Sequence, residues 1–297
     1  MKRQRENYAR RAMRELRKTD IILSQDEFAR VGAFYAKPWL REAHDAIFEL
    51  ISLCESGAQK ELIFDLLDRF VYFYEQDISN CVDYFFSHCI PIWALSTADT
   101  VIAPLHNDIR ADSSQAVLHR ISNEMKKPGK VRLDDYNSAF RAAHAHNAQK
   151  IVLVDEFVGS GDQAISVVKS LREHLDKHKI ESTLFIFSYT AMGRSKSRVS
   201  PLVADFEAAR WMKRGISDFN SFTQRKKLIS EMKEIETKLA KTGFLNGRPR
   251  KLYSLGYRQA EALFKNHSSS TPNNVFPIFH WPWLSDGSER QTVLTPA

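Results

Sequence analysis

The chain has 297 residues, of which 43% are hydrophobic and 27% are charged, as in an ordinary globular protein. No apolar run approaches the roughly 20 residues of a membrane span, and no apolar stretch follows the basic N-terminus as in a secretory signal, so we expect a cytoplasmic protein without membrane contact. The cysteines Cys54, Cys81 and Cys89 are too few and too irregularly spaced for a disulfide framework or a zinc site.

The formal net charge of +7 is concentrated at the N-terminus. Residues 1–18 hold eight basic and two acidic residues, so this arm carries six of the seven net positive charges. Such an arm suits contact with the phosphates of RNA or DNA, but a solvated helical tail explains the same pattern, and both interpretations stay open. The basic residues are Lys2, Arg3, Arg5, Arg10, Arg11, Arg14, Arg17 and Lys18.

Residues 26–98 show the spacing of amphipathic helices. Apolar residues recur three or four positions apart, as at Ile47, Leu50 and Ile51, and no convincing alternating strand pattern appears among them. Aromatic residues are dense between Phe70 and Phe86, as expected for a packed helical core. We therefore expect an all-α N-terminal region, residues 1–98, that includes the basic arm.

From residue 99 onwards, apolar strand patterns alternate with amphipathic helix patterns. This alternation predicts an α/β fold, a parallel sheet flanked by helices, in a domain of residues 99–297. The expected strands are 101–105, 150–156 and 182–190, and the expected helices between them are 115–125, 136–148 and one that runs from about 162 to 175.

The chain is less regular after residue 190. Ser217 and Asp218 are candidate caps for a long charged helix over 219–241, which Gly243 would close. We expect residues 266–283 to form a polar loop followed by a strand rich in proline and tryptophan.

The strand 150–156 ends in two acids, and a glycine-spaced turn and a helix follow it. In open α/β sheets ligands bind at the carboxyl ends of the strands, so Asp155 and Glu156 are placed to accept hydrogen bonds from two neighbouring hydroxyls. Gly159 and Gly161 allow backbone N–H groups to converge on an anion, Ser160 adds a hydroxyl, and the following helix directs its positive end to the same place. A diol beside a phosphate describes a ribose 5-phosphate. The alternative is a turn that needs glycine for its geometry alone.

The run VLVDEFVGSG (152–161) resembles the phosphoribosyl-diphosphate motif of type I phosphoribosyltransferases. The resemblance implies that Asp155 and Glu156 face the ribose hydroxyls at the catalytic centre. It also implies a loop around the 5-phosphate, made of Val158, Gly159, Ser160, Gly161, Asp162 and Gln163. The sequence departs from the family pattern at Asp162, where a small neutral residue is usual, and at Gln163, which replaces a threonine or serine.

The same resemblance implies a pyrophosphate loop after the strand 101–105, with Arg110, Ser113 and Ser114 as the matching residues. It also implies a possible Mg²⁺ ion that bridges the pyrophosphate and the ribose hydroxyls. We expect no further metal site, because His174 and His178 have helical spacing but lack a third ligand nearby.

Catalytic members of the family carry a two-stranded hood between the pyrophosphate loop and the next strand. Here the segment 126–135 has about ten residues, too few for a full hairpin. Its Lys127, Lys130 and Arg132 either reach the pyrophosphate or are ordinary solvated charges. The short segment argues against efficient transfer, because the reacting centre would stay open to water.

Three later stretches resemble a divergent branch of these phosphoribosyltransferases that occurs in bacterial conflict systems, including effectors encoded beside retron reverse transcriptases. They are RGISDF (214–219), GYRQAEALF (256–264) and TPNNVFPIFHWPW (271–283), and the resemblance covers roughly residues 45–283. It implies a role in anti-phage defence, as a toxin, trigger or nucleotide sensor, with a protein partner in a defence complex.

Two functions stay open at this point. An enzyme would bind phosphoribosyl diphosphate or a nucleotide and transfer or cleave at the anomeric carbon, as a phosphoribosyltransferase or a nucleotide glycohydrolase. A sensor would bind the nucleotide without chemistry and signal to a nucleic acid or protein partner.

Overall fold

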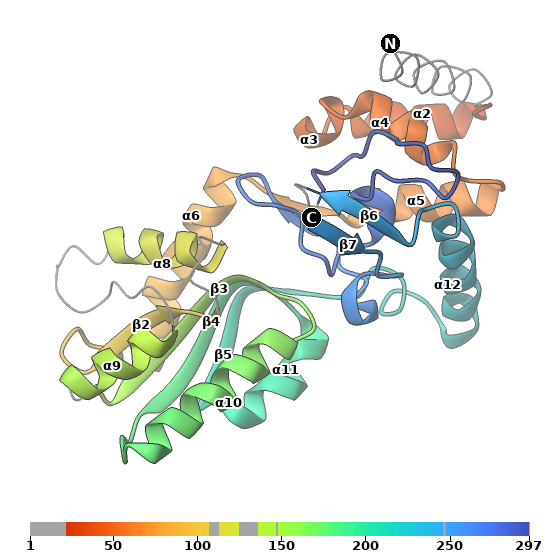
Figure 1. Ribbon diagram of the computed structural model, residues 1–297. Helices are drawn as coiled ribbons and strands as arrows, with labels where there is room; N and C mark the ends of the chain where they lie inside the picture. The colour runs from red at the N-terminus through yellow and green to blue at the C-terminus, as the bar shows by residue number, and fades with distance from the viewer. Residues whose placement is uncertain (1–21, 107–112, 125–135, 147, 246–247, 297) are drawn as a thin grey trace, which may run out of the picture. The chain divides into compact units, whose positions relative to one another are not determined.

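The computed structural model of the chain describes residues 22–106, 113–124, 136–146, 148–245 and 248–296 (Figure 1). The chain forms two compact units. We call Phe73–Lys213 the sheet unit, and we call the combination of Met1–Tyr72 with Arg214–Ala297 the split unit. This division does not coincide with the expected domains, whose boundary between residues 98 and 99 stays a prediction. The basic arm 1–18, Arg110 and the whole segment 126–135 with its three cations lie outside the described residues.

The sheet unit is built on four parallel strands in the order β2-β3-β4-β5. The parallel sheet predicted from the sequence is therefore confirmed. The last strand was missed, because it alternates buried positions with half-exposed ones such as Glu207 and lacks a continuous apolar run. The strands are β2 (Thr100–Pro104), β3 (Lys150–Val158), β4 (Thr183–Met192) and β5 (Asp205–Met212).

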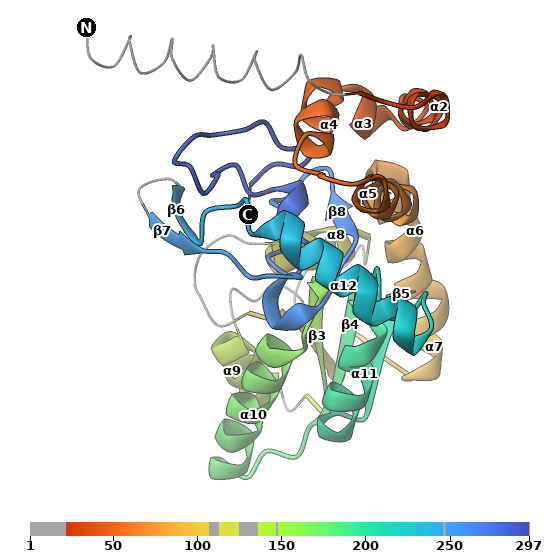
Figure 2. The ribbon, with the colours of Figure 1, turned by 90° about the vertical axis from the view of Figure 1, so that its right-hand side faces the viewer.

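Helices cover both faces of this sheet (Figures 1 and 2). Helices α9 (Tyr136–His146), α10 (Asp162–Lys177) and α11 (Gly193–Val199) pack on one face, in a core that includes Leu184 and Ile186 of β4. The alternate residues Phe185 and Phe187 point to the other face, where they contact Trp93 and Phe85 with ring centroids 4.9 Å apart in each pair.

The aromatic residues of that second face come from a nearly continuous helical segment. It consists of α6 (Glu75–Tyr84), the π-helix η1 (Phe85–Cys89) and α7 (Ile90–Ile92). Helix α8 (Ser113–Glu124) lies beside α6, because Arg120 forms a two-pronged ion pair with Glu75. The short 3₁₀ helix η2 (Ser200–Leu202) follows α11.

The split unit combines the N-terminal helices with the last third of the chain. The helical character expected for residues 26–98 is confirmed except at β1, a strand of three residues that is too short to show alternation. No described helix has both the length and the apolar composition that crossing a bilayer requires. The helices are α2 (Gln25–Phe34), α3 (Pro38–Arg41), α4 (His44–Ile51), α5 (Gly57–Arg69) and α12 (Phe222–Glu236), with the 3₁₀ turns η3 (Tyr257–Gln259) and η4 (Pro277–Phe279). The short strands are β1 (Val71–Phe73), β6 (Thr242–Leu245), β7 (Arg248–Lys251) and β8 (Phe264–Asn266).

The long charged helix predicted for the C-terminal third is confirmed as α12, but the residues predicted to cap it are wrong, and so is the strand predicted within 266–283. Helix α12 begins after Ser221, whose side chain accepts the N–H of Gln224, and ends at Glu236, while Gly243 lies in β6 under the ring of Trp283. The segment 266–283 does not continue as a strand after its loop but turns through the 3₁₀ helix η4, since proline lacks the N–H group that a strand ladder requires.

Candidate functional site

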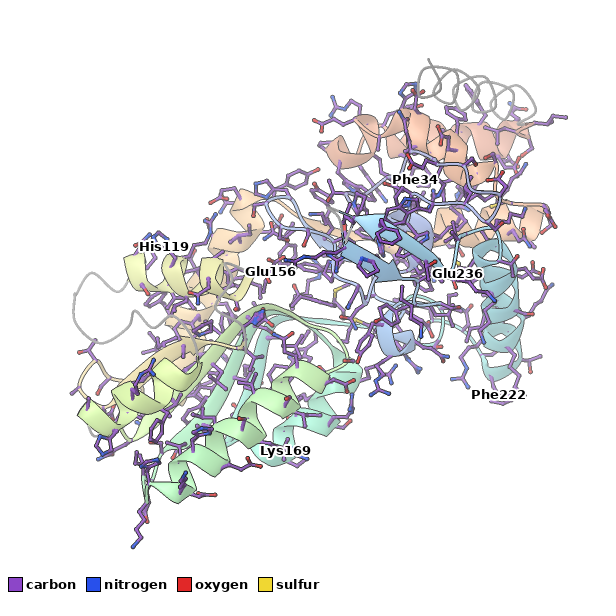
Figure 3. The ribbon with its side chains drawn as sticks, in the orientation of Figure 1. Phe34, His119, Glu156, Lys169, Phe222 and Glu236 are labelled. Atoms are coloured by element: carbon purple, nitrogen blue, oxygen red, sulfur yellow. The ribbon has the colours of Figure 1, made fainter. Side chains whose placement is uncertain are left out.

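The two acids lie at the carboxyl end of the sheet, but the strand does not end with them. Strand β3 continues to Val158, whereas its neighbour β2 ends at Pro104, opposite Val154. Asp155 and Glu156 therefore lie past the end of β2, and Asp155 remains paired with Ser188 of β4. Glu156 is labelled in Figure 3. Both are buried, with 8% and 3% of their surfaces exposed.

The extended backbone sends the two carboxyl groups to opposite sides of the strand. The side chain of Asp155 lies on the same side of β3 as Leu153, which belongs to the core under α9–α11. The Oδ1 atom of Asp155 accepts the N–H of Glu156 at 2.7 Å. The side chain of Glu156 lies on the other side of β3, with Val154, on the face of the sheet that α6 covers. One ligand that met both acids would have to cross the edge of β3 where β2 has ended, which the sequence alone did not indicate.

Strand β4 places three hydroxyls beside these acids. Ser188 pairs with Asp155, Thr190 pairs with Phe157, and Tyr189 lies between them, opposite Glu156. All three hydroxyls are buried and have no hydrogen-bond partner among the described residues. Ser188 and Thr190 lie on the same face of the sheet as Asp155, and Tyr189 lies on the opposite face, with Glu156. Buried polar atoms are nearly always satisfied, so these exceptions mark positions on both faces where a ligand or water supplies the missing partner. We did not identify these residues from the sequence, although the polar SYT triplet inside an apolar strand was a visible signal.

Tyr189 has a polar neighbourhood despite its burial. Burial raises the pKa of Tyr189, nearby Arg120 lowers it, and the carboxylate of Glu156 contributes a smaller upward shift. The phenol therefore stays protonated at neutral pH and is available as a hydrogen-bond donor. Glu156, Tyr189 and Arg120 bring an acceptor, a donor and a cation together from β3, β4 and α8.

The glycine-spaced turn leads directly into α10. Gly161 adopts φ +82° and precedes the first residue of the helix, and the Ser160 hydroxyl accepts the N–H of Asp162 at 3.2 Å. A Cβ atom at Gly161 would lie 3.0 Å from Val199 and 3.4 Å from Ser195. Packing against α11 is thus one reason for glycine here, beside the phosphate contact that the resemblance implies.

Arg198 of α11 lies against the same turn and was not identified from the sequence. Its guanidinium donates to the Ser160 carbonyl and to Asp162 Oδ1, the latter at 2.7 Å. This pairing compensates the negative charge that makes Asp162 unusual for the family. Gln163 also has a structural partner, since its side-chain amide donates to the Leu105 carbonyl at 2.8 Å and joins α10 to the end of β2.

The residues expected at a pyrophosphate loop are only partly described. Ser113 is half-buried at the start of α8, and Ser114 is completely buried in the same turn. Arg110 lies outside the described residues. The pyrophosphate role of these three residues stays a prediction.

In the split unit, two of the three later stretches meet at one buried carboxylate. Glu261 accepts the N–H of Ile216 at 2.9 Å, and the N–H and hydroxyl of Ser217 at 2.7 and 2.5 Å. The N–H of Gly215 donates to the backbone carbonyl of the same glutamate at 2.9 Å. Glu261 therefore fixes the RGISDF segment onto the GYRQAEALF segment.

The GYRQAEALF segment has an unusual backbone. Five residues between 255 and 261 have positive φ, namely Leu255, Gly256, Arg258, Gln259 and Glu261, and four of them carry side chains. Positive φ in such residues is unfavourable and persists where the surroundings enforce it. Two hydrogen bonds from the third stretch, TPNNVFPIFHWPW, help to hold this backbone in place. The Asn273 carbonyl accepts the Tyr257 N–H at 2.8 Å, and the Asn274 carbonyl accepts the Ala262 N–H at 3.1 Å.

Glu236, at the end of α12, supports the same segment (Figure 3). Its carboxyl group accepts the Leu255 N–H at 3.1 Å and the Ser254 hydroxyl at 2.5 Å. Burial raises the pKa of Glu236 to about 7, against the lowering effect of these hydrogen bonds.

The raised pKa predicts a pH-dependent stability. A carboxyl group with a folded pKa of about 7 and an unfolded pKa of about 4.5 favours folding below pH 4.5, and this contribution is lost as the pH rises through 7. The wild type should therefore lose stability relative to Glu236→Gln between pH 5 and pH 8, by up to roughly 3 kcal/mol. Urea unfolding of both proteins at the two pH values measures this difference, and an equal gap at both would contradict it.

The comparison with the variant is necessary because another buried group acts in the opposite direction. Burial lowers the pKa of His280 to about 4, so its contribution to stability is lost as the pH falls from about 6.5 to about 4. This contribution is shared by the wild type and Glu236→Gln, and it cancels in the difference between them.

The histidines at helical spacing have ordinary surroundings. His174 lies 2.7 Å from the Ser170 carbonyl, and the ring of His178 lies 4.8 Å from that of Phe140. Within the described ranges, no group of three or more potential metal ligands is present.

Comparison with known proteins adds one finding to this geometry. A family model described as PRTase-CE matches residues 54–286, which include the β3–α10 corner and all three later stretches. A comparison with curated proteins finds no match.

Proposed function

Since the chain belongs to the PRTase-CE family, phosphoribosyltransferase-like proteins of conflict systems, we propose that it binds a ribose 5-phosphate ligand at the end of β3 and acts at its anomeric carbon. The ligand is phosphoribosyl diphosphate or a nucleotide. The observation that carries this proposal is the group of three buried, unpartnered hydroxyls on β4 beside Asp155 and Glu156. A sugar phosphate offers oxygens and hydroxyls that can pair with the unpartnered hydroxyls of Ser188, Tyr189 and Thr190.

Each part of the corner has a role in this proposal. Asp155 and Glu156 accept hydrogen bonds from the ribose hydroxyls, and Tyr189 donates to a ribose or phosphate oxygen. The backbone of 159–163 and the N-terminus of α10 bind the 5-phosphate. The Asp162–Arg198 pair keeps the negative charge of the loop from repelling that phosphate.

The proposed reaction breaks the bond between the anomeric carbon and its leaving group, pyrophosphate or a base. A new bond forms from that carbon to an acceptor nitrogen or to the oxygen of water, which then loses a proton. The sugar becomes cationic on the way, so a fixed carboxylate near the ribose and a stabilised leaving group lower the barrier.

Mg²⁺ is a proposed cofactor of this reaction. The ion is usually held by one or two carboxylates together with phosphate oxygens of the substrate, so a site needs few protein ligands. The carboxylates of Asp155 and Glu156 fit this donor chemistry. When bound, Mg²⁺ would neutralise charge on a departing pyrophosphate.

In the cell, we propose a role in anti-phage defence, as a toxin or trigger or as an effector associated with a retron, with a protein partner of the defence complex. The basic arm 1–18 is a proposed contact for nucleic acid. The second candidate is a nucleotide sensor without chemistry. The complete burial of Ser114 favours it, since a pyrophosphate cannot reach that hydroxyl without rearrangement.

The test uses the unpartnered hydroxyl of Tyr189. We expect Tyr189→Phe to leave the thermal midpoint unchanged or higher, since no protein hydrogen bond is lost. The same substitution should weaken the binding of phosphoribosyl diphosphate roughly two- to tenfold. Asp155→Asn should weaken the binding of phosphoribosyl diphosphate at least about tenfold. Isothermal titration with phosphoribosyl diphosphate, in the presence of Mg²⁺, measures binding, and an assay for released pyrophosphate measures turnover.

Tyr84→Phe, on α6, and Asp176→Asn, at the exposed end of α10, are the matched controls and should bind like the wild type. Pyrophosphate released by the wild type and lost in Asp155→Asn identifies the enzyme, and binding without release identifies the sensor. Wild-type protein that binds neither phosphoribosyl diphosphate nor AMP would overturn both.

A further inference from the structure

The hairpin of β6 and β7, in the split unit, lies in a stretch of the chain without negative charge. Between Glu236 and Glu261 the sequence contains no acidic residue and six basic ones. Four of the six lie on or directly beside the two strands, and none of these four forms an ion pair within the described ranges. Such a cluster of uncompensated cations suits a partner with closely spaced negative charges. The four cations are Lys241, Arg248, Arg250 and Lys251.

Both faces of this hairpin are accessible. All four residues of β7 are exposed, and successive residues of a strand point to opposite faces, so β7 is open on both sides. In β6 only Gly243 is buried, where it approaches the ring of Trp283. Figure 2 shows the hairpin at one margin of the split unit.

The strand register distributes the cations over both faces. Thr242 pairs with Lys251 and Gly243 pairs with Arg250, so Lys251 and Arg250 lie on opposite faces of the hairpin. Arg248 lies two residues before Arg250 and shares its face. A single strand laid on the hairpin would meet the cations of one face only. A groove has phosphates on both of its walls, and it would meet the cations of both faces.

Phe244 adds an apolar group to this charged hairpin. Its side chain is 70% exposed, and its ring makes no aromatic or cation–π contact in the part of the chain that the structure describes. The register pairs it with Pro249, on the same face as Lys251. In a DNA groove, apolar side chains contact the methyl group of thymine or insert between base pairs.

A further protein strand is a poor partner for the hairpin. Proline lacks the N–H group that a ladder requires, and charged residues at a sheet edge oppose the addition of another strand. β7 has both features, since Pro249 lies between Arg248 and Arg250. The exposed edge is therefore suited to contacts through side chains.

We infer that the β6–β7 hairpin binds in the major groove of double-helical DNA. This groove is about 12 Å wide and admits a two-stranded ribbon. The four cations contact phosphates of both DNA strands, and Phe244 contacts the edges of the bases. An RNA duplex fits less well, because its major groove is too deep and narrow for side chains to enter. The inference concerns a surface different from the basic arm 1–18, and it does not depend on the ligand proposed for the β3–α10 corner.

The test is fluorescence anisotropy of a labelled DNA duplex of about 16 base pairs with the full-length protein, at salt concentrations between about 50 and 200 mM. Arg248→Gln/Arg250→Gln removes two phosphate contacts and should weaken binding at least about tenfold. It should also reduce the slope of log affinity against log salt by about 1.8, because each contact contributes about 0.9.

Lys226→Gln/Lys227→Gln is the matched control, because it removes the same charge from exposed positions of α12 in the same unit. It should keep the affinity within about twofold of the wild type and the salt slope unchanged, since charges that touch no phosphate are largely screened. The basic arm is present in every variant, so its contribution cancels in these comparisons.

A second pair of variants tests the apolar contact. Phe244→Ala should weaken binding of the duplex roughly two- to tenfold without changing the salt slope, because the lost contact carries no charge. Phe222→Ala is its control and should bind like the wild type. Phe222 is 62% exposed, but the ammonium of Lys226 lies over its ring at 4.4 Å. Thermal midpoints within a few degrees of the wild type confirm that the variants fold.

The form of the nucleic acid provides the last comparison. A single DNA strand and an RNA duplex of the same sequence should bind at least about fivefold more weakly than the DNA duplex. Four results would overturn the inference: no binding of the duplex by the wild type, unchanged affinity and slope in the arginine variant, an equal loss in the α12 variant, or a single strand or RNA duplex that binds as tightly as the DNA duplex.

Discussion

Gly256→Ala is expected to destabilise the split unit by roughly 2–6 kcal/mol, from backbone strain of ~1–3 kcal/mol and overpacking of ~1–3 kcal/mol. Gly256 has φ +77° and ψ 163°, a conformation that residues with a Cβ atom rarely adopt. The added Cβ would lie 1.9 Å from the carbonyl oxygen of Asn274 and 2.5 Å from its carbonyl carbon. Since both are backbone atoms, the clash cannot be relieved by rotating a side chain.

Thermal unfolding followed by calorimetry measures this loss. For a unit of this size, each kcal/mol corresponds to roughly 2–4 °C, so the first transition should fall by at least about 4 °C. Gly32→Ala is the matched control, because a Cβ at Gly32 in α2 meets no atom within 4 Å. It should be neutral or slightly stabilising. A Gly256→Ala protein that melts with the wild type would show that this close approach does not exist in solution.

Glu261→Ala is expected to cost about 3 kcal/mol or more, because it leaves three buried donors without an acceptor, each worth ~1–3 kcal/mol. The donors are the N–H groups of Ile216 and Ser217 and the Ser217 hydroxyl. All three belong to the RGISDF segment, so the loss should also release this segment from the GYRQAEALF segment. Hydrogen exchange of residues 214–219, together with urea unfolding, measures both effects.

Glu261→Gln separates hydrogen bonding from charge. Its amide oxygen replaces the carboxylate oxygen that accepts the two N–H groups, and its NH₂ group donates to the Ser217 hydroxyl, which then accepts. We therefore expect Glu261→Gln to lose less than half as much stability as Glu261→Ala. Equal losses in the two variants would mean that the negative charge, and not the acceptor geometry, holds the segments together.

Both predictions give a structural meaning to the stretches that carry the family resemblance. Glu261 joins the first stretch to the second, and Gly256 lets the second approach the third at Asn274. The sequence order of these stretches was recognisable without a structure. Their mutual contacts explain why a single buried glutamate and a single glycine are required at those positions.

The first three strands of the sheet unit were predictable because each has an apolar run that indicates its burial. The apolar runs of β3 and β4 are buried on both sides, as expected for a parallel sheet, so their approximate bounds and the acids near the end of β3 could be read directly. The exact end of β3 could not. Phe157 and Val158 extend the ladder with β4, and a run of two residues after a pair of acids gives no local sign of that pairing.

The sequence by itself determined the fold class, the family, and the position of the glycine turn at the carboxyl end of β3. These follow from local periodicity, turn chemistry and motif, all of which act between residues close in the chain. Only the tertiary structure decided which residues from other segments lie around that turn. The β3–β4 register sets Tyr189 opposite Glu156, and the packing of α11 brings Arg198 to Asp162. Contacts of this kind depend on strand register and helix packing between distant segments, and periodicity specifies that a face is buried without specifying its partner.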